Sequence, residues 1–191
     1  MATIRLAVLG SGNGTNAQRI AEYFSGNPAV EVACIVYNKP DAYIATRARN
    51  LGIEARYFGR DDFYRSNRVA DYLAQKKTDW VILAGFLWLV PANLLQAYPG
   101  HIINIHPALL PLYGGRGMYG EHVHEAVIAH HETESGITIH LVDEQYDHGT
   151  ILFQARCSVS PNDTPDTLAQ KIHSLEYEHF PRVIEQTVLP R

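Results

Sequence analysis

The sequence predicts an α/β protein built on a doubly wound, mostly parallel sheet of the Rossmann-like kind, with an antiparallel element towards the C-terminus. Strand-like apolar runs alternate with helical patterns through the first two thirds of the 191 residues, which is typical of parallel sheets. The first run is continuous and ends in glycines, as expected of a strand that is buried on both faces. The last two strand-like runs lie close together along the chain, which favours antiparallel pairing there.

The first half of the chain predicts four strands separated by helices. The strands are expected at residues 4–9, 30–37, 54–58 and 80–84. Helices are expected at residues 16–24, 42–51 and 61–75, and a fourth starts near Pro91. The second helix ends before Gly52, a residue that readily closes a helix. The third is a single long amphipathic helix opened by acidic residues.

The second half begins with a strand at residues 101–105. A glycine-rich loop at residues 113–120 then leads to a helix at about residues 122–129. Two more strands are expected at residues 136–142 and 151–159, and a last helix runs from about residues 164–166 towards residue 188.

Composition indicates one globular domain, residues 1–191, in the cytoplasm. Hydrophobic residues make up 46% of the chain, charged residues 19%, and the net charge of −4 gives no electrostatic footprint for nucleic acid or an anionic membrane. The longest apolar run, residues 79–90, is too short to span a membrane, and the N-terminus lacks a signal-peptide cleavage pattern. Cys34 and Cys157 are interpreted as buried thiols in a reducing compartment.

The glycine-rich segment between the first strand and the first helix is a candidate phosphate site. Glycines let the backbone approach an anion, the helix N-terminus offers N–H groups, and Thr15 and Asn16 add side-chain donors. Residues 12–17 also fit the loose dinucleotide pattern G-x-G-x-x-A. A dinucleotide site expects an acidic residue after the second strand, where Asn38, Lys39 and Pro40 stand instead. We therefore favour a single phosphate, with a dinucleotide or a purely structural turn as alternatives.

Asn104, His106 and Asp147 form the candidate catalytic set. Residues two apart in a strand point the same way, so Asn104 and His106 should project together from the carboxyl end of a buried strand. Asp147 follows a later strand and can orient the imidazole or relay a proton. An amide donor beside a group that titrates near neutrality suggests acyl transfer, whereas the alternative is an ordinary strand end with a satisfied histidine.

Two other chemistries are alternatives to this set. The sequence contains no G-x-S-x-G nucleophile elbow, so we do not expect a route through a covalent acyl-serine. Ten histidines suggest metal binding, but His122 and His124 are two apart on a helix and do not face one direction. A zinc site of His106, His124 and Asp147 stays an alternative, and we expect no metal. His122, His124 and His140 also fit pocket positions, and His130 and His131 fit an exposed helix end.

Beyond these individual sites, the chain resembles the phosphoribosylglycinamide formyltransferase family, folate-dependent enzymes of purine biosynthesis. The similarity covers nearly the whole length, through SGNGTN, NKPDAYIATRA, AGFLWLV, NIHPALLP, SGITIHLVDEQYDHG and LEYEHFPRVI. It implies a formyltransferase fold and transfer of the formyl group of 10-formyltetrahydrofolate, as co-substrate, to the amine of 5-phosphoribosylglycinamide. The partners implied are these small molecules, with no nucleic acid and no membrane.

The resemblance also implies roles for individual residues. Asn104, His106 and Asp147 match the catalytic residues of the family. The residues matched to substrate binding are the phosphate-loop residues Gly14, Thr15 and Asn16, and the ribose-binding Glu176. Those matched to folate binding are Arg60, Leu87, Trp88, Leu89, Val90, Asp143, Glu144, Gln145 and Tyr146.

Some features differ from the family pattern. Trp88 stands where arginine is common, the loop YGGRGMYGEHVH is several residues longer than expected, and His148-Gly149-Thr150 replaces a frequent Gly-Gly-Pro. Related alternatives are methionyl-tRNA formyltransferases and formyltetrahydrofolate deformylases, whose additional domains we expect to be absent, and sugar-nucleotide formyltransferases. A non-catalytic nucleotide-binding module is the alternative outside the class, and it has no use for the catalytic set.

Overall fold

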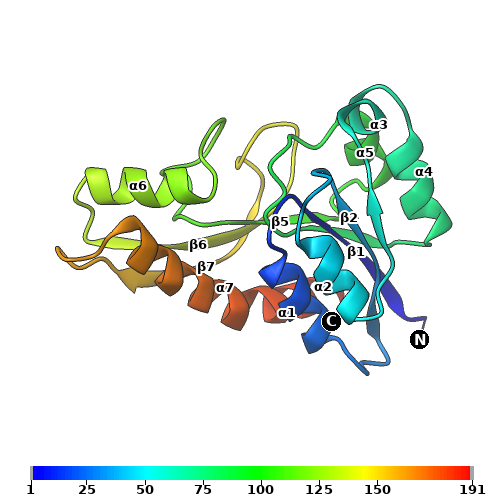
Figure 1. The fold of residues 1–191 in the computed structure, drawn as a ribbon, viewed down its shortest axis with the longest axis horizontal. Coiled ribbons are helices and arrows are strands. Elements are labelled where there is room, and N and C mark those ends of the chain that lie inside the picture. The colour runs from blue at the N-terminus through cyan, green and yellow to red at the C-terminus, as the bar shows by residue number, and fades with distance from the viewer. Residues whose placement is uncertain (1, 190–191) are drawn as a thin grey trace.

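The computed structural model describes residues 2–189, within which seven strands form one mixed sheet in the order β3-β2-β1-β4-β5-β6-β7 (Figure 1). The strands are β1 (Ile4–Gly10), β2 (Val30–Tyr37), β3 (Ala55–Tyr57), β4 (Trp80–Leu83), β5 (Ile102–His106), β6 (Glu134–Leu141) and β7 (Ile151–Ser158). The first five pair in parallel, whereas β6 is antiparallel to both β5 and β7. The predicted mostly parallel sheet with an antiparallel C-terminal element is confirmed.

Helices cover both faces of the sheet, and the alternation of side chains along β1 explains why. Leu6 and Val8 pack into one hydrophobic core, whereas Ala7 and Leu9 pack into the other. Residues of α1 (Thr15–Tyr23), α2 (Ile44–Asn50), α6 (Glu121–Ala129) and α7 (Pro165–Val188) build the first core. The second core contains residues of α3 (Arg60–Tyr64), α4 (Arg68–Gln75) and α5 (Ala92–Ala97), which lie together at one end of the molecule (Figure 1).

The strand order creates a switch point between β1 and β4. The chain runs outward from β1 through β2 to β3, and then returns to place β4 on the other side of β1. In open α/β sheets, the loops at the carboxyl ends of strands diverge at such a point and leave a crevice for ligands. The glycine-rich loop after β1 and the loop after β4 therefore flank one crevice, with β5 beside it.

The prediction of one long helix at residues 61–75 is wrong, because two shorter helices, α3 and α4, occupy this stretch. They are separated at Ser66, whose hydroxyl donates a hydrogen bond to the backbone carbonyl of Asp62 at 3.0 Å. A serine hydroxyl competes in this way with the helical backbone ladder. The apolar periodicity continues across the break and therefore does not reveal it.

The two cysteines differ in burial. Cys34 is fully buried on β2, as predicted, but Cys157 is only partly buried on β7, so that part of the prediction is wrong. Strand β7 lies at the edge of the sheet, where one neighbour and part of the cover are missing. Both thiols are free. Within residues 2–189, no helix combines the length and apolar character needed to cross a membrane.

Candidate active site

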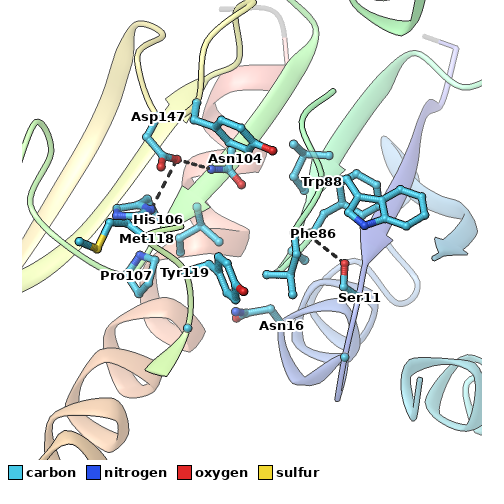
Figure 2. A pocket seen from close by; sticks show the side chains of 18 of the residues that line it. Ser11, Asn16, Phe86, Trp88, Asn104, His106, Pro107, Met118, Tyr119 and Asp147 are labelled. Carbon is cyan, nitrogen blue, oxygen red and sulfur yellow. Dashed lines mark hydrogen bonds and ion pairs between the residues drawn. The ribbon is translucent and has the colours of Figure 1, made fainter. Parts of the chain in front are cut away.

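A cavity of about 560 Å³ opens at the carboxyl ends of β1, β4 and β5 (Figure 2). Its wall comes mainly from the segments at residues 11–16, 84–90, 104–107 and 115–120. Further lining side chains come from β6, α6 and α7, namely His140, His124, His173 and Glu176. The cavity therefore lies at the switch point, and it brings together segments from the whole length of the chain.

Strand pairing sets one end of this cavity, which we call the catalytic end. Asn104 and His106 lie two residues apart near the end of β5 and both line the cavity, as the alternation of a strand requires. The antiparallel register places His140 of β6 directly opposite Asn104. Figure 2 shows Asn104 and His106 both turned towards the carboxylate of Asp147, which comes from the loop after β6.

The Asn104 amide is held in a fixed orientation. Nδ1 of His140 lies 2.8 Å from the carbonyl of Leu141 and donates to it, which leaves Nε2 as the acceptor. Nδ2 of Asn104 donates to that Nε2 at 3.0 Å and, over a longer 3.5 Å, to Oδ1 of Asp147. One N–H of the amide is therefore firmly anchored, and the other is only weakly engaged.

Each ring nitrogen of His106 faces an acceptor. Nε2 lies 2.7 Å from the carbonyl of Tyr113, so this nitrogen carries a proton, and Nδ1 lies 3.5 Å from Oδ1 of Asp147. Burial lowers the pKa of His106, while the Asp147 carboxylate and the Tyr113 carbonyl oppose that shift. His106 is therefore neutral near pH 7, in a site that can stabilise the imidazolium once a proton arrives.

Asp147 connects the catalytic end to the long glycine-rich loop. Its backbone has φ +55°, a left-handed conformation that aspartate tolerates better than most residues. Oδ2 accepts the backbone N–H of Gly115 at 2.9 Å. Burial alone would raise the pKa of Asp147, but interactions with His140, His106 and this N–H outweigh it and lower the pKa. The carboxylate is thus ionised beside His106.

The opposite end of the cavity, which we call the substrate end, is built on the loop at residues 12–16. Helix α1 begins there without a side-chain cap, so its first N–H groups are available to an anion. Gly14 has φ +79°, and a Cβ on it would lie 2.8 Å from Cα of Ile44. Gly12 has open space where its Cβ would be. Gly14 is therefore needed for packing, whereas Gly12 leaves the backbone accessible from the cavity.

A buried carboxylate lies beside this loop. Glu176 of α7 is 6% exposed, and its Oε2 accepts from Nδ2 of Asn16 at 2.9 Å. The same oxygen lies 3.0 Å from Nδ1 of His173, and this hydrogen bond raises the pKa of His173. Gly14, Thr15, Asn16 and Glu176, the residues matched to substrate binding, thus all line the cavity.

The residues matched to folate binding divide into two groups. Those that line the cavity are Leu87, Trp88, Leu89, Val90, Gln145 and Tyr146. Arg60, Asp143 and Glu144 are not part of its wall. The Arg60 guanidinium lies 5.9 Å from the centre of the Trp88 ring, behind the lining. Trp88 and Phe86 lie across the cavity from His106 and Asp147 (Figure 2).

Several residues that line the cavity were not predicted as site residues from the sequence. Ser11 anchors the loop after β4, because its hydroxyl accepts the N–H of Leu87 at 2.9 Å. Met118 and Tyr119 come from the long loop, and Tyr119 lies between Pro107 and Asn16 in Figure 2. Lys39 and His173 also line the cavity. Lys39 had a sequence signal, since it follows the second strand, where a ligand-binding residue is expected in this fold.

The histidines do not create a recognisable metal cluster in the part of the chain that the structure describes. Across residues 2–189, no group of three or more histidine, cysteine, aspartate and glutamate side chains is arranged to hold a metal ion. The zinc alternative of His106, His124 and Asp147 gains no support from this geometry. His122 pairs with Glu125 on the exposed side of α6 and does not line the cavity.

Comparison with protein families gives a match over nearly the whole chain. The formyl transferase family profile matches residues 4–184. A chloroplastic phosphoribosylglycinamide formyltransferase of Arabidopsis thaliana is 41% identical over 186 residues, which are 94% of this chain and 64% of that protein. This chain therefore spans less than two thirds of that relative. A phosphoribosylglycinamide formyltransferase of Haemophilus influenzae is 34% identical, over 95% of this chain and 85% of that protein.

Solved structures match equally well. The phosphoribosylglycinamide formyltransferase of Bacillus halodurans superposes with a TM-score of 0.86 at 35% identity, covering 96% of this chain and 95% of that one. Glycinamide ribonucleotide transformylase 1 of Geobacillus kaustophilus gives a TM-score of 0.89 at 32% identity, covering 98% and 100%. The similarity thus extends over the whole sheet and both layers of helices.

Proposed function

The chain belongs to the formyl transferase family, and we propose that it transfers the formyl group of 10-formyltetrahydrofolate to the amine of 5-phosphoribosylglycinamide. The products are the formylated ribonucleotide and tetrahydrofolate, in de novo purine biosynthesis. One observation carries this proposal: a single cavity has Asn104, His106 and Asp147 at one end and an uncapped helix N-terminus beside Glu176 at the other. The names of the relatives support the choice of substrates.

The ribonucleotide binds with its phosphate at the substrate end. The first N–H groups of α1 and the Thr15 hydroxyl donate to the phosphate, and the Lys39 ammonium adds an opposite charge. Glu176 accepts hydrogen bonds from the ribose hydroxyls, with Asn16 holding its carboxylate in place. The amine of the substrate then reaches the catalytic end.

The folate binds on the other side of the catalytic end. Its pterin lies against the backbone of residues 87–90 and the loop at residues 145–147. Tyr64 fixes the first of these segments, because its hydroxyl donates to the carbonyl of Leu89 at 2.8 Å. The folate is consumed as a co-substrate, and no metal takes part. Two free thiols suit the reducing cytoplasm in which we expect the reaction.

Formyl transfer begins when the amine nitrogen attacks the formyl carbon and a C–N bond forms. The formyl oxygen becomes an oxyanion, and the weakly engaged N–H of Asn104 donates to it in place of the long contact with Asp147. The other N–H stays on His140 and keeps the amide aligned. Donors of this kind contribute about a hundred- to a thousand-fold to the rate.

Proton movement uses the pair of His106 and Asp147. Neutral His106 takes up a proton from the attacking amine, directly or through water, and the imidazolium is stabilised by Asp147 on one side and the Tyr113 carbonyl on the other. The pair then delivers a proton to N10 of the folate, the C–N10 bond breaks, and tetrahydrofolate leaves. General acid–base help of this kind contributes about a hundred- to ten-thousand-fold.

One assay tests the proposed function. Purified protein is mixed with 10-formyltetrahydrofolate, with and without 5-phosphoribosylglycinamide, and formation of tetrahydrofolate is followed by absorbance. We expect turnover that requires the amine. Equal turnover without the amine would indicate a deformylase, and turnover only with an amino-sugar nucleotide would indicate a different acceptor. A protein that binds nucleotides but transfers no formyl group would contradict the proposal.

A further inference from the structure

His124 is a buried polar side chain in the wall of the cavity that the mechanism above does not use. It lies in the first half of α6, is 4% exposed, and lines the cavity. Its Nδ1 is buried and has no hydrogen-bond partner within residues 2–189. Because Nδ1 is enclosed, the ring can exchange a hydrogen bond with a ligand in the cavity only through its other nitrogen, Nε2.

The state of the imidazole follows from its surroundings. Burial lowers the pKa of His124. His173 and His106 shift this pKa in the same direction, and Glu176 raises it. A neutral ring carries one proton, and leaving a bare lone pair at the enclosed Nδ1 costs less than leaving an N–H there without an acceptor. Nε2 therefore carries the proton. It is not among the enclosed unpartnered atoms, so this N–H is presented to the cavity.

The position of His124 identifies the part of the substrate that it meets. It shares the cavity wall with His106 at the catalytic end and with Glu176 and His173 at the substrate end, and α6 packs against α7, which carries the latter two. In the proposed function, the amine lies at His106 and the ribose hydroxyls at Glu176. The group between them is the amide of the glycinamide arm, whose carbonyl oxygen accepts hydrogen bonds.

We propose that His124 is a substrate-binding residue that donates a hydrogen bond from Nε2 to the amide carbonyl of the glycinamide arm. This inference rests on the proposed function, because it assigns the acceptor from the proposed substrate. The bond ties the arm to α6 and so positions the terminal amine against the formyl carbon. It also distinguishes substrates with a carbonyl at this position from phosphorylated riboses that lack the arm.

Binding measurements with two ligands test this role. The dissociation constants of 5-phosphoribosylglycinamide and of ribose 5-phosphate, which has no arm, are measured by calorimetry for wild type and variants. His124→Leu removes the donor, His124→Gln keeps an amide N–H near the position of Nε2, and His124→Asn is too short to reach. His122→Leu, on the same helix but outside the cavity wall, is the matched control.

We expect His124→Leu and His124→Asn to weaken binding of 5-phosphoribosylglycinamide about five- to ten-fold, the value of one hydrogen bond. Ribose 5-phosphate should bind all variants equally, and the Gln and His122 variants should stay near wild type. Equal weakening towards both ligands, or no weakening at all, would overturn the inference. If the Leu variant does not fold, the Gln and Asn variants alone decide. A wild-type protein that does not bind 5-phosphoribosylglycinamide would contradict the proposed function itself.

Discussion

The two ends of the cavity satisfy their polar groups in opposite ways. At the catalytic end, Asn104, His106 and Asp147 hydrogen-bond or face one another and nearby backbone groups, at distances of 2.7–3.5 Å. At the substrate end, Glu176 is held by Asn16 and His173, but helix α1 has no side-chain cap. The groups that perform the chemistry are thus held in place by the protein, whereas the first N–H groups of α1 are left for the ligand.

This difference makes the two ends separable by kinetics. Preorganised groups act on the transition state, so their loss should lower kcat. Groups left free to hydrogen-bond the substrate stabilise the ground state as well as the transition state. Their loss should therefore raise KM for the ribonucleotide while kcat changes little. The four predictions below test this separation, starting with the largest effect.

His106→Ala should lower kcat by about a thousand-fold, because the variant lacks the group that takes up and returns the proton. KM for 5-phosphoribosylglycinamide should change less than about three-fold, since His106 is bonded to the protein and not reserved for the ligand. Steady-state kinetics measure both constants. His122→Ala, on the exposed side of α6, is the control and should keep the wild-type kcat. A variant that retains full kcat would remove His106 from the mechanism.

Asp147→Asn should lower kcat by about a hundred-fold and move the acidic limb of the pH profile to lower pH. Activity needs neutral His106 and falls as the pH drops through its pKa, which burial holds below the ordinary value. The Asp147 carboxylate raises that pKa, so removing its charge lowers the pKa further. A pH–kcat profile of both proteins measures the shift. A limb that moves to higher pH, or stays in place, would show that Asp147 does not tune His106.

Gly14→Ala should lower Tm by about 4–8 °C, because a side chain at φ +79° is strained by roughly 2 kcal/mol and meets Ile44. Gly12→Ala should leave Tm unchanged, since its Cβ has open space, but should raise KM for the ribonucleotide about ten-fold by crowding the phosphate. Thermal melting and kinetics on both variants provide the comparison. Equal losses of Tm would mean that both glycines serve only the turn.

Lys39→Met should give the smallest effect, about a three-fold rise in KM for 5-phosphoribosylglycinamide with kcat unchanged. The side chain is exposed, so water and salt screen its attraction to the phosphate. The rise should shrink as the salt concentration increases. Arg49→Met, an exposed cation outside the cavity wall, is the control and should have no effect. If Lys39→Met changed only kcat, Lys39 would act at the catalytic end and not on the phosphate at the substrate end.

The sequence predicted most of the fold, and the reasons are local. Residues 6–9 are apolar without a break because both faces of β1 are covered, and this pattern can be recognised without knowing which elements pack on it. Thr164 and Pro165 mark the start of α7 by capping chemistry within one turn. The break between α3 and α4 was missed because one hydroxyl at Ser66 ends a helix without disturbing its apolar period.

The candidate site was predictable only in part. Asn104 and His106 follow from the alternation of one strand, and the N-terminus of α1 follows from a glycine-rich turn. Their roles remain proposals. His122 and His124 were both candidates for the pocket, and the sequence could not separate them, because two histidines in one short helix differ only in what surrounds them.

By itself, the sequence determined the order of strands and helices apart from the break between α3 and α4, the burial of the central strands on both faces, and the local pairing of an amide with an imidazole on β5. Only the tertiary structure decided which distant residues share a cavity. Asn16 and Glu176 are 160 positions apart in the chain, yet their side chains meet at 2.9 Å. Local patterns depend on neighbours within a few residues, whereas such a contact depends on strand order and on the packing of α7 against α1.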